Sequence, residues 1–193
     1  MRCGILYVAA ASTLLAGIDT ARAALNGNAT IVLDSITGPV GSPLYNYTLT
    51  LHNTGTTPIG TFWYAWIEDP ELDFLPSFPT NISVPSGWYG LPSGGPGHYS
   101  IEWYNYFGNN VPAGGTQTFS FSTADSPSII NGQSPLYPAY KTQTSVIYEG
   151  FPEASPGVQF VVANLPVAVP EPASLTLLGA AAAALLARRR AKR

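Results

Sequence analysis

Four carboxylates stand close enough together in the chain to hold a hard cation. They fall within six consecutive positions, as Glu68, Asp69, Glu71 and Asp73. Calcium ions prefer oxygen ligands, and carboxylates supply many of them in proteins. The spacing is not that of an EF-hand loop, and a proline interrupts it at position 70. The sequence therefore predicts either a Ca²⁺ site at these residues or an acidic turn that faces solvent.

The residue types needed for nucleophilic catalysis are scarce. The single cysteine, Cys3, lies in a segment that we expect to be removed, and no Gly-x-Ser-x-Gly motif occurs. His52 falls on the polar side of an alternating segment and His98 in a glycine-rich stretch, where solvated side chains are expected. We therefore predict that the protein is not an enzyme and needs no cofactor besides Ca²⁺ at most. A carboxylate pair that hydrolyses polysaccharide is the enzymatic alternative, because the sequence does not show which acids are close in space.

Aromatic side chains are dense in the middle of the chain and could stack on sugar rings. The candidates for glycan binding are Trp88, Tyr89 and Trp103, with the amides of Asn105 and Asn109 as hydrogen-bonding partners. The alternative is that the same rings build the core of a domain that has no disulfide bond.

Alternating apolar and polar residues indicate that these side chains stand on short β-strands. The clearest such segment is Leu44–His52, and Gln117–Ser122 has the same pattern. Thr61–Ile67 is apolar on both faces and reads as a central strand. Leu75–Pro96 is rich in proline and reads as a long loop. About seven short strands predict an all-β fold, a single antiparallel β-sandwich of immunoglobulin-like type, over residues 24–164.

The charge of this predicted domain excludes one class of partner. Between residues 24 and 169 the chain has one basic residue, Lys141, and nine acidic ones, so its net charge is 1 − 9 = −8. Nucleic acids and anionic lipid surfaces are bound by basic patches. We therefore predict no nucleic-acid partner.

The first 23 residues have the pattern of a secretory signal peptide. Arg2 precedes an apolar run over residues 5–16, and Ala21 and Ala23 have the small side chains that a signal peptidase requires. We expect cleavage before Ala24, so the mature protein is exported.

The last residues form a second processing segment after a linker at 165–169. It begins with Pro170, Glu171 and Pro172, which favour an extended, exposed backbone. Residues 173–187 carry no charge, and a helix of this length spans roughly 22 Å. That is short of the ~30 Å hydrocarbon layer, so a short transmembrane helix here is a poor permanent anchor. The basic cluster that follows is expected to stay cytoplasmic, and consists of Arg188, Arg189, Arg190, Lys192 and Arg193.

In order and spacing, the three parts of residues 170–193 resemble the PEP-CTERM sorting domain of Gram-negative bacteria. The resemblance implies that an exosortase recognises the Pro-Glu-Pro motif and removes the tail. It also implies transient anchoring in the inner membrane, followed by release to the cell surface or the extracellular matrix. Segments of the body such as Pro85–Trp88 and Gly157–Val162 resemble uncharacterised PEP-CTERM surface proteins.

These observations favour a secreted surface or matrix protein with a structural or adhesive role in the envelope or biofilm. The alternative is a carbohydrate-binding module that recognises exopolysaccharide through exposed aromatic side chains.

Overall fold

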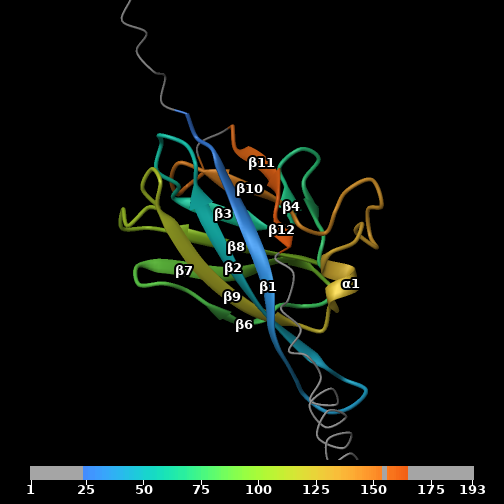
Figure 1. The fold of residues 1–193 in the computed structure, drawn as a ribbon. Coiled ribbons are helices and arrows are strands. Elements are labelled where there is room, and N and C mark those ends of the chain that lie inside the picture. The colour runs from blue at the N-terminus through green and yellow to red at the C-terminus, as the bar shows by residue number, and fades with distance from the viewer. Residues whose placement is uncertain (1–23, 154–155, 165–193) are drawn as a thin grey trace, which may run out of the picture.

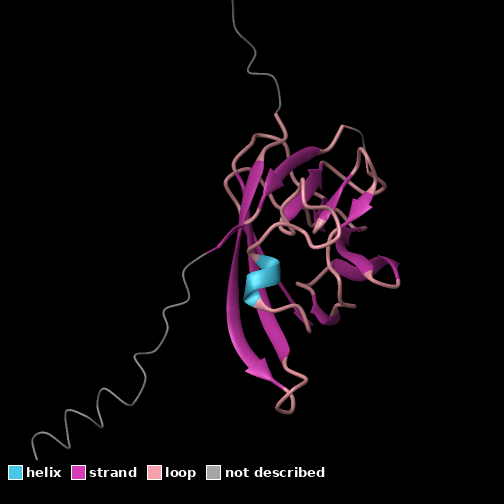
Figure 2. Cartoon of the chain, turned by 90° about the vertical axis from the view of Figure 1, so that its right-hand side faces the viewer, coloured by secondary structure: helices cyan, strands magenta, loops and turns pink. Residues whose placement is uncertain are grey.

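The computed structural model describes residues 24–153 and 156–164, and shows two β-sheets packed face to face (Figures 1 and 2). The first sheet has the strand order β12-β1-β2-β9-β6. Its strands are β1 (Gly27–Thr37), β2 (Leu44–Asn53), β6 (Thr80–Ser83), β9 (Thr116–Thr123) and β12 (Ala163–Asn164). The second sheet has the order β11-β10-β3-β8-β7. Its strands are β3 (Thr61–Tyr64), β7 (Trp88–Gly95), β8 (His98–Asn105), β10 (Thr144–Tyr148) and β11 (Val158–Val161).

Neighbouring strands pair antiparallel in both sheets, except for β1 and β12, which are parallel. A third, two-stranded sheet joins β4 (Trp66–Ile67) to β5 (Leu72–Asp73), and the only helix in the described residues is the short α1 (Pro127–Ile130). The prediction of an all-β antiparallel sandwich is confirmed. The order of the strands in space resembles that of immunoglobulin variable domains, but the order along the chain differs. The strand in the position of β6 follows those in the positions of β7 and β8 in an immunoglobulin variable domain, whereas here β6 precedes them.

The core lies between the sheets and follows from side-chain alternation. On β2, Tyr47, Leu49 and Leu51 point inward, and Phe119 and Phe121 do the same on the neighbouring β9. From the second sheet, Phe62, Tyr64, Ile101, Trp103 and Ile147 close the core. Interleaved residues of the opposite parity face away from the core on each sheet, which gives the molecule two outer faces.

Two stretches differ from the prediction. The apolar run Thr61–Ile67 is not one strand, because Ala65 adopts a positive φ of 59° and divides it into β3 and β4. The predicted loop Leu75–Pro96 contains β6 and β7. Pro92 fits into β7 because β7 is the edge strand of its sheet, where a missing N–H leaves no ladder hydrogen bond unmade.

Both processing segments lie outside the described residues: the signal peptide with Ala21 and Ala23, and the C-terminal tail with Pro170, Glu171, Pro172 and the basic cluster. Among the described residues, no helix is both long and apolar enough to cross a membrane.

Candidate functional site

Two of the four clustered carboxylates, Asp73 and Glu68, have different partners in the structure. Asp73, on β5, lies 3.7 Å from Nδ1 of His98. Glu68, just after β4, is in hydrogen-bond contact with the side chain of Tyr148 on β10. Among residues 24–153 and 156–164, no three His, Cys, Asp or Glu side chains come together as a metal site would require. The structure thus gives the Ca²⁺ hypothesis no geometric support in this part of the chain.

Two of the three candidate glycan-binding aromatics prove to be core residues. Trp103 is 0% exposed and Trp88 4% exposed, and the Trp88 Nε1–H donates to the carbonyl of Asn109 at 3.1 Å. Neither ring can stack on a sugar from outside, so the assignment of Trp88 and Trp103 to a glycan site is wrong. Their strand parity is the reason, because they share the inward-facing side with Ile101. Tyr89 has the opposite parity and is 45% exposed.

Tyr89 belongs to a group of aromatic rings on the outer face of the second sheet. We call this group the aromatic cluster, and it consists of Tyr89, Tyr104, Tyr106, Phe107 and Phe151. Tyr89 stacks on Tyr104 with ring centroids 5.4 Å apart, and Tyr104 stacks on Phe151 at 4.1 Å. Further ring contacts join Phe151 to Tyr106, Tyr106 to Phe107 and Phe107 to Tyr89, at 5.8, 5.7 and 6.3 Å. The five rings therefore form a closed circuit of contacts.

Strand pairing and one buried amide hold the cluster in place. Tyr89 and Tyr104 are directly opposite each other on β7 and β8. Tyr106 and Phe107 lie in the turn after β8, which Asn105 shapes: its Oδ1 accepts the backbone N–H groups of Phe107 and Asn109 at 2.9 and 3.0 Å. Asn105 is itself buried, so its amide shapes the turn and is not free for a glycan as the sequence suggested. The two rings of this turn are the most accessible ones, with Tyr106 65% and Phe107 71% exposed.

A pair of carboxyl groups borders the aromatic cluster on the same outer face. Glu102, on β8, lies opposite Trp63 of β3, and its side chain is in hydrogen-bond contact with that of Glu153. Glu153 Oε1 also accepts the Nε1–H of Trp63 at 3.0 Å, and the Trp63 ring stacks on Trp66 at 4.5 Å. Burial, and secondly the contact with Glu153, raises the pKa of Glu102 to about 8. Glu102 is therefore protonated at neutral pH, when it can donate to the Glu153 carboxylate.

This carboxyl pair does not have the geometry of glycoside hydrolysis. The two groups that flank a glycosidic bond stand at least about 5 Å apart to leave room for the sugar. Glu102 and Glu153 are in direct contact, so no substrate bond fits between them. The pair instead fastens Glu153 against the sheet next to the aromatic cluster.

The raised pKa of Glu102 predicts a pH dependence of stability. Because the folded state holds the proton more tightly than the unfolded chain, the contribution is complete below about pH 4.5 and is lost as the pH rises through about 8. After discounting for the partial exposure of Glu102, we expect the free energy of unfolding to fall by about 1–2 kcal/mol between pH 5 and pH 9. Denaturant unfolding at several pH values measures this, and Glu102→Gln should remove most of the slope. The control is Glu71→Gln in an exposed turn; an equal loss of slope in both variants would contradict the assignment.

The tail matches the predicted sorting segment. Residues 168–190 match the PEP-CTERM protein-sorting motif, so the class of protein is an exported β-sandwich that bears a sorting tail. This match confirms the predicted sorting segment, and the PEP-CTERM protein-sorting motif implies processing by an exosortase and export toward the cell surface. The match does not extend to the body, and no curated protein matches the chain. Resemblance of the body to other PEP-CTERM proteins therefore stays a prediction.

Solved structures show distant likeness to the body. An inactive mutant of the GH20 exo β-N-acetylglucosaminidase from Vibrio harveyi matches with 15% identity and a TM-score of 0.41, over 72% of this chain and 18% of that one. The chitin-binding domain of Chi18aC from Streptomyces coelicolor matches with 22% identity and a TM-score of 0.28, over 50% and 79% of the two chains. A carbohydrate-binding module of Ruminiclostridium thermocellum matches with 12% identity and a TM-score of 0.31, over 63% and 97%. The chain thus spans less than a fifth of the Vibrio enzyme, and likeness at these levels carries no functional conclusion.

Proposed function

We propose that the exported domain is an adhesive module of the cell surface or the extracellular biofilm matrix, and that it adheres by stacking its aromatic cluster on exopolysaccharide. The observation that carries this proposal is the closed circuit of five contacting rings on one outer face, with Tyr106 and Phe107 mostly exposed. On this proposal signal peptidase removes residues 1–23 and the exosortase removes the tail during export.

The physical chemistry of the cluster suits a sugar. The CH groups on one face of a pyranose ring are apolar, and they pack against the electron-rich face of an aromatic ring. Because the five rings contact one another, each is held in a defined orientation before any ligand arrives, which lowers the entropic cost of binding. In the free protein these exposed rings are in contact with water, which is unfavourable for an apolar surface. A stacked sugar removes part of that surface from water.

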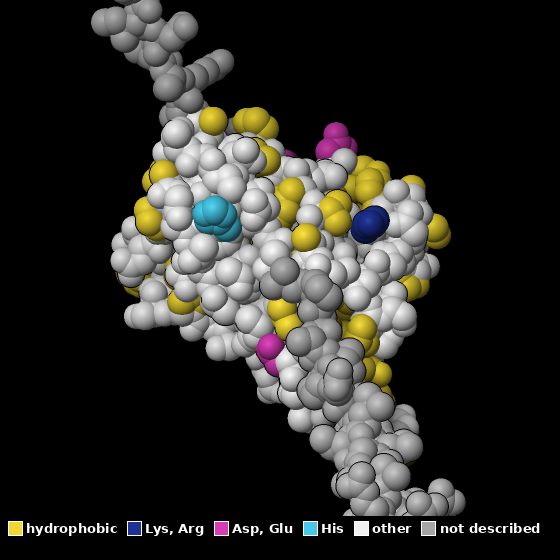
Figure 3. Space-filling view, viewed as in Figure 1, with side chains coloured by type: hydrophobic (Ala, Val, Ile, Leu, Met, Phe, Trp, Pro, Cys, Tyr) yellow, Lys and Arg dark blue, Asp and Glu magenta, His cyan; other side chains and the backbone are white. Residues whose placement is uncertain are grey.

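The charge of the domain narrows the class of polysaccharide. Lys141 is the only Lys or Arg among the described residues, and the visible face of the molecule in Figure 3 is mostly uncharged. Near the cluster, the Glu153 carboxylate would repel a polyanion, and the protonated Glu102 offers it no positive charge. A neutral polysaccharide is therefore the partner that fits.

The side chains in and beside the aromatic cluster favour binding of polysaccharide over its hydrolysis. The carboxyl pair beside the cluster is too close to flank a glycosidic bond. Neither histidine lies in the cluster: His98 faces Asp73 and His52 stands on β2 of the other sheet. The proposed activity is binding, without a catalytic step.

The test is a binding measurement with the protein purified from its host and the host's own extracellular polysaccharide. The double variant Tyr106→Ala/Phe107→Ala removes the two most exposed rings, and we expect the affinity to fall about tenfold or more. Val40→Ala is the matched control, because Val40 is an exposed apolar residue in the loop between β1 and β2, outside the cluster. Equal affinity of the double variant and the wild type would contradict the proposal. Repeating the measurement with Ca²⁺ and with a chelator tests the acidic residues Glu68 and Asp73 independently.

A further inference from the structure

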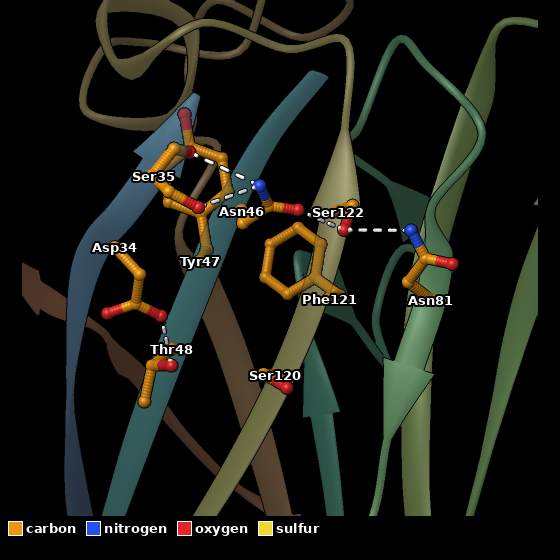
Figure 4. A pocket seen from close by; sticks show the side chains of 9 residues that line it. All are labelled: Asp34, Ser35, Asn46, Tyr47, Thr48, Asn81, Ser120, Phe121 and Ser122. Carbon is orange, nitrogen blue, oxygen red and sulfur yellow. Dashed lines mark hydrogen bonds between the residues drawn. The ribbon is translucent and has the colours of Figure 1, made fainter. Parts of the chain in front are cut away.

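The first sheet has a pocket on its own outer face (Figure 4). The aromatic cluster is on the outer face of the second sheet, so the two sites are on opposite sides of the sandwich. Its volume is about 330 Å³. Residues from four neighbouring strands line it, namely Asp34, Ser35, Asn46, Tyr47, Thr48, Asn81, Ser120, Phe121 and Ser122. Tyr47 and Phe121 have side chains buried in the core, so hydroxyl and amide groups and a single carboxylate supply the polar surface of the pocket.

The backbone explains why polar groups gather here. Asn46 is paired with Ser122 and Thr48 with Ser120, and both pairs have the parity opposite to the core residues of β2 and β9. The pairing of β1 with β2 shifts register between Leu33 and Ser35, so Asp34 is an extra residue at that point. Its carboxylate accepts a hydrogen bond from the hydroxyl of Thr48.

A ladder of side-chain hydrogen bonds crosses the pocket from β1 to β6. The Asn46 Nδ2–H donates to Ser35 Oγ at 2.9 Å, and the Ser122 hydroxyl donates to Asn46 Oδ1 at 2.6 Å. The Asn81 Nδ2–H then donates to Ser122 Oγ at 3.2 Å. Asn81 turns its amide oxygen away from the ladder, and Asp34 likewise has one oxygen directed away from Thr48 (Figure 4). The ladder thus fixes the side chains while two acceptors point away from it.

Asn81 also holds an unusual backbone conformation. Its φ is 49°, in the left-handed region that residues other than glycine seldom occupy, and asparagine tolerates it better than most. The pairing of β6 with β9 shifts register between Thr80 and Ser83, on either side of this residue. The left-handed conformation and the ladder together place the Asn81 amide at the pocket, and such local exceptions cluster at ligand sites.

From this geometry we propose that the pocket binds a neutral saccharide unit. Sugar hydroxyl groups both donate and accept hydrogen bonds, so they match a wall of Ser, Thr and Asn groups with the acceptors of Asp34 and Asn81. The carboxylate of Asp34 and the absence of Lys and Arg from the lining disfavour an anionic ligand. The volume lies at the lower end of the range of about 300–1,000 Å³ for small-ligand pockets, which suits a short sugar segment and not a long chain.

A site on each outer face makes the domain bivalent. If the aromatic cluster binds polysaccharide as proposed above, one molecule holds two chains on opposite sides of the sandwich and cross-links them. The saccharide site at the pocket does not depend on that function, whereas the cross-linking does.

The pocket can be tested with substitutions that are expected to leave the protein folded. Asn81→Gly removes the amide and relieves the left-handed backbone, because glycine adopts a positive φ without steric cost. Asp34→Ala removes the carboxylate at an exposed position. The matched control is Thr118→Ala, on the same outer face but outside the pocket.

Binding is measured with the host's extracellular polysaccharide, and cross-linking as polysaccharide sedimented by the protein. We expect Tyr106→Ala/Phe107→Ala to retain weaker binding, and addition of Asn81→Gly/Asp34→Ala to remove it. The pocket variant alone should bind but no longer sediment polysaccharide, while Thr118→Ala should behave as wild type. Unchanged sedimentation by the pocket variant, or absence of residual binding in the aromatic variant, would overturn the pocket site. If instead the aromatic substitutions change nothing while the pocket substitutions abolish binding, the proposed function fails and the pocket site stands.

Discussion

Replacing Trp103 by alanine is expected to lower the free energy of unfolding by about 3–5 kcal/mol. The ring is fully buried in the core between the two sheets, on β8 of the second sheet. It packs against Phe119 and Phe62 with centroids 5.0 and 5.6 Å away. On the neighbouring edge strand β7, Gly90 is paired with Trp103, and only glycine fits there because a Cβ would come within 2.8 Å of the indole. Alanine would leave a cavity that these rigid aromatic neighbours cannot fill.

Trp103→Phe is the control for this experiment. Trp103 Nε1 has no hydrogen-bond partner among the described residues, so phenylalanine removes a buried unpaired donor as well as some volume. We expect it to cost about 1–2 kcal/mol, clearly less than alanine. Denaturant unfolding of the three proteins measures both effects. If alanine proved as mild as phenylalanine, Trp103 would be at a surface, and the assignment of the ring to a glycan site would have to return.

The contrast between Trp103 and Tyr104 shows what alternation alone can predict. Ile101 and Trp103 share one side of β8, and Glu102 and Tyr104 share the other. The apolar Ile101 marks the core side, so the burial of Trp103 was available from the pattern once that strand was recognised. Trp88 was harder to place, because its strand lay hidden in a segment whose prolines indicated a loop.

The aromatic cluster and the polar pocket could not have been assembled from the sequence. Phe151 meets Tyr104 across 47 positions of chain, as 151 − 104, and only the packing of a loop on the sheet brings them together. Asn81 reaches Ser122 over 41 positions through a pairing that contains a register shift. Strand existence follows from local periodicity, but the order of strands within a sheet does not, and both sites depend on that order. The division of Thr61–Ile67 at Ala65 has the same origin, because the residue type alone gives no sign of a positive φ.

The second large effect on the free energy of unfolding is expected at Asp125. Nothing in the sequence distinguishes this residue from the other acidic residues of the domain. It is almost fully buried just after β9, and it ties the segment before β6 to the core. Its Oδ1 accepts the hydroxyl of Ser77 at 2.7 Å, and its Oδ2 accepts the Ser77 N–H at 3.2 Å and the Thr123 hydroxyl at 3.1 Å. Burial raises the pKa of Asp125, and these hydrogen bonds oppose that rise without cancelling it.

We expect Asp125→Ala to lower the free energy of unfolding by about 2–4 kcal/mol, because the three donors of Ser77 and Thr123 lose a charged acceptor. Asp125→Asn retains an acceptor for part of this set and should cost less. Ser77→Ala removes one of the bonds, and a double-mutant cycle with Asp125→Ala should show a coupling of about 1 kcal/mol or more.

The direction of the pKa shift adds a check that separates Asp125 from an ordinary salt-bridged acid. With its pKa raised, Asp125 is more easily protonated in the folded state, so its contribution to stability declines as the pH rises through the folded-state value. Acidification should therefore not unfold the wild type through this residue, and Asp125→Asn should leave the acid stability unchanged. If Asp125→Asn instead protected the protein against acid, the carboxylate would have a lowered pKa. Its hydrogen bonds with Ser77 and Thr123 would then outweigh the cost of burial.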